Sequence, residues 1–479
     1  MTHEMKIDKE FAALIPPLSG GKKGDEMAET RNVSEIVYRD DLYPRIETSA
    51  VTVQKYAEDL SVLPPVEINQ HNQLIDGWHR WTAHKKREAA TIRVIVTETK
   101  SDAHLLELAI ERNAIHGLQL SQADKKKMAV KIYTSITERG ERVKVKERLV
   151  KILSVSEKLL DAWLSRCEKD MKDSAKRDAF DLWLSCHTQD EIAERVGWPR
   201  QSITDWLKGI AEKPENGESG NTHVSGSDDD DSSESAFALS KAEMAAAEHA
   251  TDFQTPFYNV WKQQERTSSS KHFGNSEVRW LDNLLYLYTK PLTDIVIDPF
   301  AGGGSTIDLC RTRFRRYLVS DRKPIIEREK DIRVHDLIGS DGKPMLPDLR
   351  KRWQDVRLVY LDPPYWKQAE GQYSTDPTDL ANMDLDAFNA ALAGIINGFA
   401  KKMSNAYIAL IIQPTQWKSP GRQFTDHVGD MLRAIKLPVE MRYSVPYESQ
   451  QCTPQMVEWA KSERKVLVLS REIVVWNVK

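Results

Sequence analysis

Four consecutive residues, Asp362-Pro363-Pro364-Tyr365, follow a β-branched run and could carry out chemistry on a nucleic-acid base. A base amine is a poor nucleophile because its lone pair is delocalised into the ring. Hydrogen-bond acceptors at the Asp362 carboxylate and the Pro363 carbonyl would draw the nitrogen toward tetrahedral geometry and expose that lone pair. Pro364 restricts the backbone so that the carbonyl faces the site. The Tyr365 ring offers a stacking face for a base taken out of a duplex. The alternative is a rigid Asp-Pro turn that only ends a strand.

A second motif lies upstream, where the apolar run Ile295–Ile297 ends at Asp298 and the glycines Gly302, Gly303 and Gly304 follow. A strand, a glycine loop and a helix in this order let a ligand approach the backbone at the carboxyl end of the strand. No Lys–Ser/Thr pair follows the glycines, which disfavours a nucleoside-triphosphate loop. A simple glycine turn is the alternative.

Two further acids end strand-like runs, Asp321 in RRYLVSD and Asp336 in DIRVHD. In nucleotide-binding α/β folds an acid at the position of Asp321 accepts ribose hydroxyls. Because parallel strands end at one edge of a sheet, these acids, the glycine loop and Asp362 are expected to share that edge.

Together, the run from Asp298 to Gly304 and the tetrapeptide from Asp362 to Tyr365 resemble the amino-methyltransferase family that acts on adenine N6 or cytosine N4. The resemblance covers roughly Thr255 to Lys479 and implies S-adenosylmethionine as the cofactor. It implies catalytic roles for Asp362, Pro363, Pro364 and Tyr365. It also implies cofactor-binding roles for Asp298, Pro299, Phe300, Gly302, Gly304, Asp321 and Asp336. An Asp rather than a Ser at position 362 favours adenine over cytosine in this family.

The resemblance implies an α/β fold with a doubly wound, seven-stranded sheet. Later segments fit this expectation, with helices over 387–399 and 424–435, a strand over 406–414, and a closing hairpin from 439–445 and 465–478. We expect no long recognition insertion in this half, so selection of a DNA sequence must come from short loops or from elsewhere in the chain.

In the N-terminal half, a strand leads into Asp76-Gly77-Trp78-His79-Arg80, and a helix follows. A glycine turn with a cation at a helix N-terminus is suited to holding a phosphate, here through Gly77, His79 and Arg80. This motif and a capped helix that begins at Ser121 resemble the ParB-like family over roughly Val33 to Ile210. His79-Arg80 stands where partition proteins carry paired arginines, which leaves nucleotide hydrolysis in doubt. The alternative is a fold kept only as a scaffold.

A helix-turn-helix is predicted where the capping box of Thr188 and Glu191 opens one helix, Gly197 supplies a turn and Ile203 anchors the next helix. The second helix would present four residues to the major groove of DNA. These residues are Arg200, Gln201, Thr204 and Lys208. An ordinary helical hairpin is the alternative.

These motifs divide the chain into four parts. We expect a small α+β ParB-like domain at 33–100, a helical DNA-binding region at 101–210, an acidic flexible linker at 211–240 and a methyltransferase domain at 251–479. Tethering through the linker would keep the catalytic half near bound DNA.

The composition of the chain limits its expected location, metal content and partners. The four cysteines lack metal-ligand spacing and the N-terminus is charged, so we expect a cytoplasmic protein with no structural metal. No apolar run approaches the length of a membrane span. The net charge is −4, yet ten Lys or Arg and three Glu lie between Lys125 and Lys151. Double-stranded DNA is the expected partner, and a homodimer through the N-terminal half is a further expectation.

Three functional hypotheses follow. The first is a site-specific DNA methyltransferase, acting on adenine N6 or cytosine N4, of a type associated with phages, mobile elements or restriction-modification. The second is a ParB-like partition or regulatory protein whose C-terminal half only senses the cofactor. The third is methylation of RNA or of a protein glutamine amide, for which relatives carry Asn in place of Asp362.

Overall fold

The computed structural model has mixed α/β architecture with sheets of four, two and seven strands. The chain divides into two compact units, Met1–Ala175 and Lys176–Lys479. None of the helices in the described part of the chain is long and apolar enough to cross a membrane. The structure describes residues 28–115, 120–136, 139–208, 210, 237–262, 277–328, 330–339, 343–349, 352–367, 370–371, 374–417, 423–446 and 453–479.

The first unit begins with a four-stranded sheet in the order β1-β4-β2-β3, in which only β2 and β4 are parallel. Buried apolar side chains of these strands pack with Trp81. The strands and the first two helices are β1 (Glu29–Asn32), α1 (Ala50–Glu58), β2 (Val66–Ile68), β3 (Leu74–Asp76), α2 (Trp78–Lys86) and β4 (Thr91–Val96).

A helical segment follows the small sheet. Its helices are α3 (Asp102–Ile115), α4 (Gln122–Thr134), α5 (Arg139–Leu153) and α6 (Glu157–Leu184). The predicted capping box at the start of α4 is confirmed: the side chains of Ser121 and Asp124 each accept a hydrogen bond from the other's backbone N–H. The boundary between the two compact units falls inside α6, and not at the acidic segment where the sequence suggested a division.

The second unit contains the seven-stranded sheet and the remaining helices. Its strands are β5 (Ile295–Asp298), β6 (Arg316–Asp321), β7 (Arg333–Val334), β8 (Val356–Leu361), β9 (Ala406–Ile412), β10 (Thr415–Trp417), β11 (Gln423–Thr425), β12 (Val439–Pro446) and β13 (Ser470–Val478). Its helices are α7 (Gln189–Val196), α8 (Arg200–Leu207), α9 (Lys241–Ala247), α10 (Val278–Tyr288), α11 (Ser305–Thr312), α12 (Leu385–Ala400), α13 (His427–Ala434) and α14 (Pro454–Ser462).

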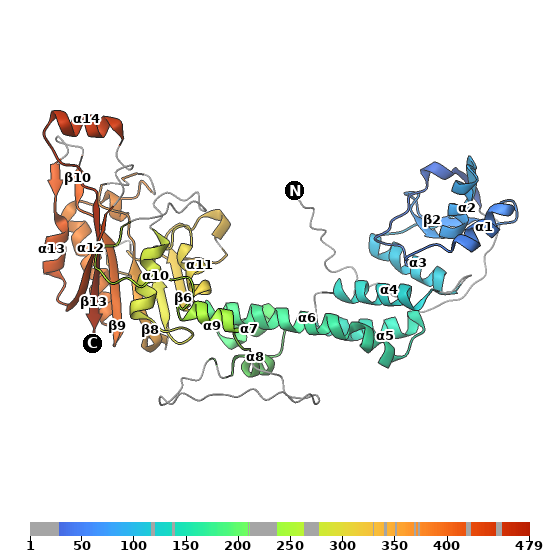
Figure 1. Ribbon diagram of the computed structural model, residues 1–479, viewed down its shortest axis with the longest axis horizontal. Coiled ribbons are helices and arrows are strands. Elements are labelled where there is room, and N and C mark those ends of the chain that lie inside the picture. The colour runs from blue at the N-terminus through green and yellow to red at the C-terminus, as the bar shows by residue number, and fades with distance from the viewer. Residues whose placement is uncertain are drawn as a thin grey trace. The chain divides into compact units, whose positions relative to one another are not determined.

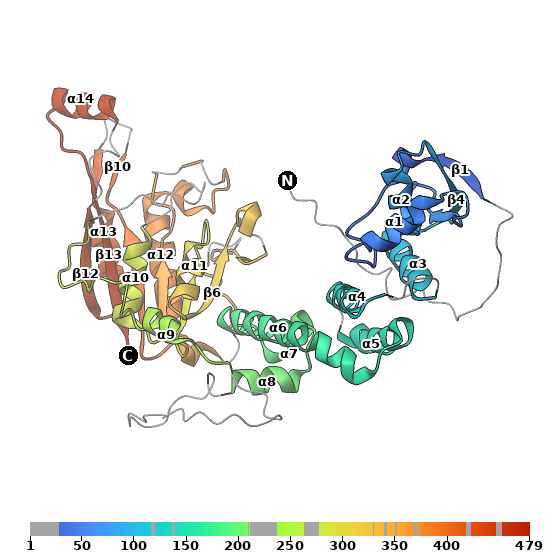
Figure 2. The ribbon, with the colours of Figure 1, turned by 45° about the vertical axis from the view of Figure 1, so that its right-hand side comes forward.

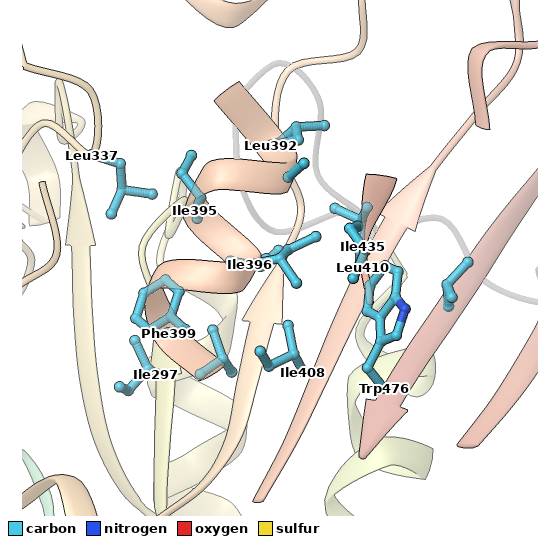
Figure 3. Close-up of a cluster of buried hydrophobic side chains, with 14 of the residues drawn as sticks. Ile297, Leu337, Leu392, Ile395, Ile396, Phe399, Ile408, Leu410, Ile435 and Trp476 are labelled. Atoms are coloured by element: carbon cyan, nitrogen blue, oxygen red, sulfur yellow. The ribbon is translucent and has the colours of Figure 1, made fainter. Parts of the chain in front are cut away.

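Both faces of the large sheet are buried, as a near-continuous apolar sequence in its strands requires. Alternate residues of β5, β8, β9 and β13 join one cluster with α12 and α13. Figure 3 shows part of this cluster, with the α12 side chains Ile395, Ile396 and Phe399 beside the strand residues Ile297 and Ile408. The intervening strand residues, such as Val296 and Leu358, are also fully buried.

The strand order is β12-β13-β9-β8-β5-β6-β7, and β13 runs antiparallel to both of its neighbours. From β5 the chain first adds β6 and β7 on one side, then returns to add β8 and β9 on the other. The gap between the ends of β5 and β8 is therefore the topological switch point, where open α/β sheets bind ligands. The predicted antiparallel pair of β12 and β13 is confirmed, although α14 lies between them in sequence.

The acidic segment expected at 211–240 lies mostly outside the described residues, which begin again at Phe237. The residues that flank it meet: the backbone N–H of Phe237 donates to the carbonyl of Trp206 over 2.8 Å. This hydrogen bond connects α8 to the residues that lead into α9.

A buried polar cluster joins α10 to the end of α11. The Asp282 carboxylate accepts hydrogen bonds from Arg313 (2.8 Å) and from His249 (2.8 Å). Burial alone would raise the pKa of Asp282, but these two donors lower it below its usual value. Arg313 is itself buried and also binds Asp252 at 2.7 Å.

We predict that Arg313→Met destabilises the second unit by about 3–5 kcal/mol, because it leaves the Asp282 carboxylate buried without its main cation. Calorimetric unfolding of the full chain measures this. The control is Arg433→Met, which removes an exposed partner of Asp430 and should cost at most about 1 kcal/mol. Equal losses in the two variants would contradict the prediction.

Candidate active site

Three carboxylates lie together at the carboxyl ends of parallel strands. Asp298 is the last residue of β5, Asp321 is the last residue of β6, and Asp362 follows the last residue of β8. The negative charges of Asp362 and Asp321 contribute to the pKa of Asp298, so the three groups are close enough to interact. The shared edge expected from the sequence is therefore present.

The glycine loop between β5 and α11 has the backbone that only glycine adopts without strain. Gly302 has φ of 48° and Gly304 has φ of 82°, and Gly304 is the residue that precedes α11. The N–H of Gly302 donates to the Asp321 carboxylate over 2.9 Å, which ties the loop to the end of β6. The other Asp321 oxygen accepts from the N–H of Lys323 at 2.8 Å.

Asp298 holds the other side of the loop. Its carboxylate accepts from the N–H of Phe300 (2.9 Å) and from the hydroxyl of Thr306 (2.5 Å). The pKa of Asp298 is raised to about 7, mainly by burial and also by the charges of Asp362 and Asp321, whereas these two hydrogen bonds oppose the rise. Pro299 is buried, and the Phe300 ring packs against the main cluster.

The residues of the predicted catalytic tetrapeptide are linked to β13. The Tyr365 hydroxyl donates to Oδ1 of Asp362 over 3.2 Å and accepts from Nη1 of Arg471 over 3.0 Å. The Arg471 guanidinium also lies 5.5 Å from the centre of the Tyr365 ring and 5.2 Å from that of Trp280 on α10. Pro363 is buried and Pro364 is half-buried. Segments far apart in sequence thus fix the Tyr365 ring.

Three residues at this edge were not predicted from the sequence. Arg471 is a buried cation near the start of β13, a strand that the sequence predicted only as part of the closing hairpin. The sequence around Trp280 contains no pattern that indicates a role at this edge. Arg322 follows Asp321 and pairs with Asp336 at 3.1 Å and with Asp376 at 2.6 Å.

Asp336 lies two residues beyond β7, at the same edge as the other acids. One of its oxygens accepts from the N–H of Ile338 at 3.1 Å, and the other pairs with Arg322. Its predicted contact with the cofactor remains a prediction.

The residues of the predicted phosphate site in the first unit are engaged elsewhere. Gly77, with φ of 101°, precedes α2 as expected. Arg80 pairs with Asp76 at 2.7 Å. His79 is buried, and its Nε2 accepts from the N–H of Ser49 over 2.9 Å. This nitrogen cannot also donate to a phosphate, so the phosphate site remains a prediction that rests on the backbone of Gly77 and its neighbours.

The expected helix-turn-helix geometry is present in α7 and α8. The capping box of Thr188 and Glu191 forms, Gly197 ends α7 in the left-handed region, and Ile203 is fully buried. Of the four residues predicted to contact DNA, three are exposed and Thr204 is half-buried. The exposed residues are Arg200, Gln201 and Lys208.

No protein-family model matches this chain, and no curated protein matches it. Solved structures similar to part of the chain are ParB proteins. ParB from Caulobacter crescentus complexed with CTP-gamma-S is 18% identical, with a TM-score of 0.18 over 29% of this chain and 76% of that one. The same protein complexed to the centromeric parS site is 15% identical, with a TM-score of 0.21 over 39% and 87%. A Pnob8-like ParB-N domain is 13% identical, with a TM-score of 0.25 over 40% and 82%. TM-scores of this size do not establish a shared fold.

We predict that Asp298→Asn changes how stability depends on pH. The folded chain keeps the Asp298 carboxyl protonated up to about pH 7, whereas the unfolded chain releases that proton near pH 4. The free energy of unfolding of the wild type therefore falls as pH rises from about 4 to about 7, by roughly 1.4 kcal/mol per pH unit. Asp298→Asn has no carboxyl group at this position, so its free energy of unfolding does not show this fall.

Calorimetric unfolding at pH 5 and pH 7.5 measures the difference between the two chains. Asp430→Asn, at an exposed position of α13, is the control and should show the pH dependence of the wild type. A constant difference between wild type and Asp298→Asn across this range would contradict the assignment.

Proposed function

We propose that this protein is a DNA methyltransferase that transfers a methyl group from S-adenosylmethionine to the N6 amine of adenine. One observation carries the proposal: the glycine loop after β5 and the tetrapeptide after β8 lie on the two sides of the topological switch point. Open α/β sheets bind ligands in the crevice at this switch point. The glycine loop and the tetrapeptide are also the two motifs whose residue types suggested ligand binding and catalysis.

The residues at the edge suit the proposed cofactor. Gly302 and Gly304 allow close approach to the backbone because a β-carbon would strain the conformation at both positions. Asp321 and Asp336 supply carboxylates for ribose hydroxyls. The nearby charge of Asp362 complements a sulfonium cation. When bound, S-adenosylmethionine supplies an electrophilic methyl group.

The protein's own residues would prepare the amine. The Asp362 carboxylate and the Pro363 carbonyl accept hydrogen bonds from its two protons, and the lone pair then points toward the methyl group. The Asp362 carboxylate would accept the proton that the amine loses once its lone pair is committed to the new bond. Tyr365 stacks on the base, and Arg471 keeps the ring in place through the hydroxyl. Arg471 acts as a positioning residue.

We predict that Asp362→Ala lowers turnover far more than it lowers cofactor affinity, because the lost interaction strengthens as the amine becomes tetrahedral. Titration calorimetry measures affinity for S-adenosylmethionine, and mass spectrometry of digested DNA measures the methylated base. Asp430→Ala, which removes an exposed carboxylate from α13, is the control. Full activity in Asp362→Ala would refute the mechanism, whereas methylcytosine as the sole product would refute only the choice of base.

A second prediction concerns Arg471. Its hydrogen bond to Tyr365 is charge-assisted, so Arg471→Met should lower kcat/KM about tenfold, as expected for the loss of roughly 1.5 kcal/mol. Arg471→Lys should recover part of this loss. The fluorescence of a 2-aminopurine target should also show weaker stacking of the flipped base in Arg471→Met.

The matched control for Arg471 is Arg442→Met, which removes an exposed partner of Glu472 from the neighbouring strand. A merely structural role for Arg471 would lower thermal stability and leave base stacking in the folded fraction unchanged. That result would exclude the proposal that Arg471 positions the Tyr365 ring.

A further inference from the structure

The helix-turn-helix belongs to the same compact unit as the large sheet, and the segment that leads into α7 packs against that sheet. Cys186, between α6 and α7, lies in the buried cluster that contains Ile295 and Ile297 of β5. Its carbonyl accepts a hydrogen bond from Arg352. Phe180 on α6 stacks on Phe237 with ring centres 4.3 Å apart. These contacts fix the end of α6 and the start of the segment that leads into α7.

The contacts all lie at one edge of the sheet. Arg316, the first residue of β6, lies 4.7 Å from the centre of the Trp183 ring. Phe314, which contacts Phe180 with ring centres 6.1 Å apart, lies two residues before the start of β6. Arg352 begins the short 3-10 helix Arg352–Asp355, which directly precedes β8. The helix-turn-helix is therefore anchored at the amino ends of the parallel strands, whereas the candidate active site lies at their carboxyl ends.

The ribbon views agree with this placement. In Figures 1 and 2, α7 and α8 lie toward the edge at which the antiparallel strand β13 ends, whereas β10 and α14 lie at the opposite edge. The strand β6 has six residues. At about 3.3 Å per residue it places roughly 20 Å between the two edges.

Within the described part of the second unit, the outward face of α8 carries exposed cations. Its inner face is formed by Ile203, Trp206 and Leu207, all buried, so Arg200 and Lys208 face outward. Arg200 pairs with Asp190 at 3.3 Å, but both side chains are mostly exposed, and such a pair contributes little and is easily exchanged for a phosphate.

We propose that α8 binds a segment of double-stranded DNA separate from the segment that enters the active site. The inference rests on the proposed function. DNA is stiff, with a persistence length of about 50 nm, so a short duplex with its target base at the carboxyl edge does not bend back to the amino edge. The backbone N–H of Phe237 donates to the carbonyl of Trp206, so α8 is held to the rest of the second unit at that point. The helix-turn-helix therefore holds the enzyme on DNA and does not select the methylated sequence.

The experiment compares two full-length variants that each lose two positive charges. One is Arg200→Ala with Lys208→Ala on α8, and the control is Lys401→Ala with Lys402→Ala, at exposed positions after α12. Substrates are a plasmid and a duplex of about 12 base pairs, roughly 40 Å long, that contains the sequence methylated by the wild type. Base-resolved sequencing identifies the methylated sites, and gel mobility at low salt measures binding to long DNA.

We expect the α8 variant to methylate the plasmid at least fivefold more slowly and to bind it less tightly, with rates on the short duplex within twofold of the wild type and with the same methylated sequence. The control variant should match the wild type throughout. A changed methylated sequence, a slowed reaction on the short duplex, or an unchanged plasmid rate would each overturn the inference. A wild type that methylates neither substrate refutes the proposed function instead, and weaker plasmid binding by the α8 variant would then still identify α8 as a DNA contact.

Discussion

The geometry of the candidate site depends on the hydrogen bonds of one buried carboxyl group. Asp298 joins the end of β5 to the N–H of Phe300 in the glycine loop and to the hydroxyl of Thr306 in α11. Asp321 holds the same loop from the neighbouring strand through Gly302. These contacts hold the loop, in which Gly302 and Gly304 adopt the left-handed conformation. The burial that makes the arrangement rigid also raises the pKa of Asp298.

Local sequence patterns predicted the parts of the molecule that are determined locally. The capping boxes at Ser121 and Thr188, the glycine loop, and the acids at the ends of β5, β6 and β8 all follow from residues close in sequence. The two motifs meet because parallel strands end at one edge. No long-range information was needed beyond that rule.

The features that were missed depend on contacts between distant segments. Arg471 reaches Tyr365 across 106 positions of sequence, and the position of β13 between β9 and β12 leaves no local trace. The same is true of His79, whose type suggested a ligand contact but whose ring is buried against the backbone of Ser49.

The position of β13 has a consequence for the order in which the unit folds. β13 follows both β9 and β12 in sequence, yet it lies between them and pairs with each. During synthesis, β12 therefore leaves the ribosome before the strand through which it joins the sheet. Pairing of this kind has high contact order and is slow. Since β13 also carries Arg471, the Tyr365 ring acquires its support only in the last stage of sheet assembly, so a partly folded chain would have the glycine loop before it had an ordered base-stacking surface.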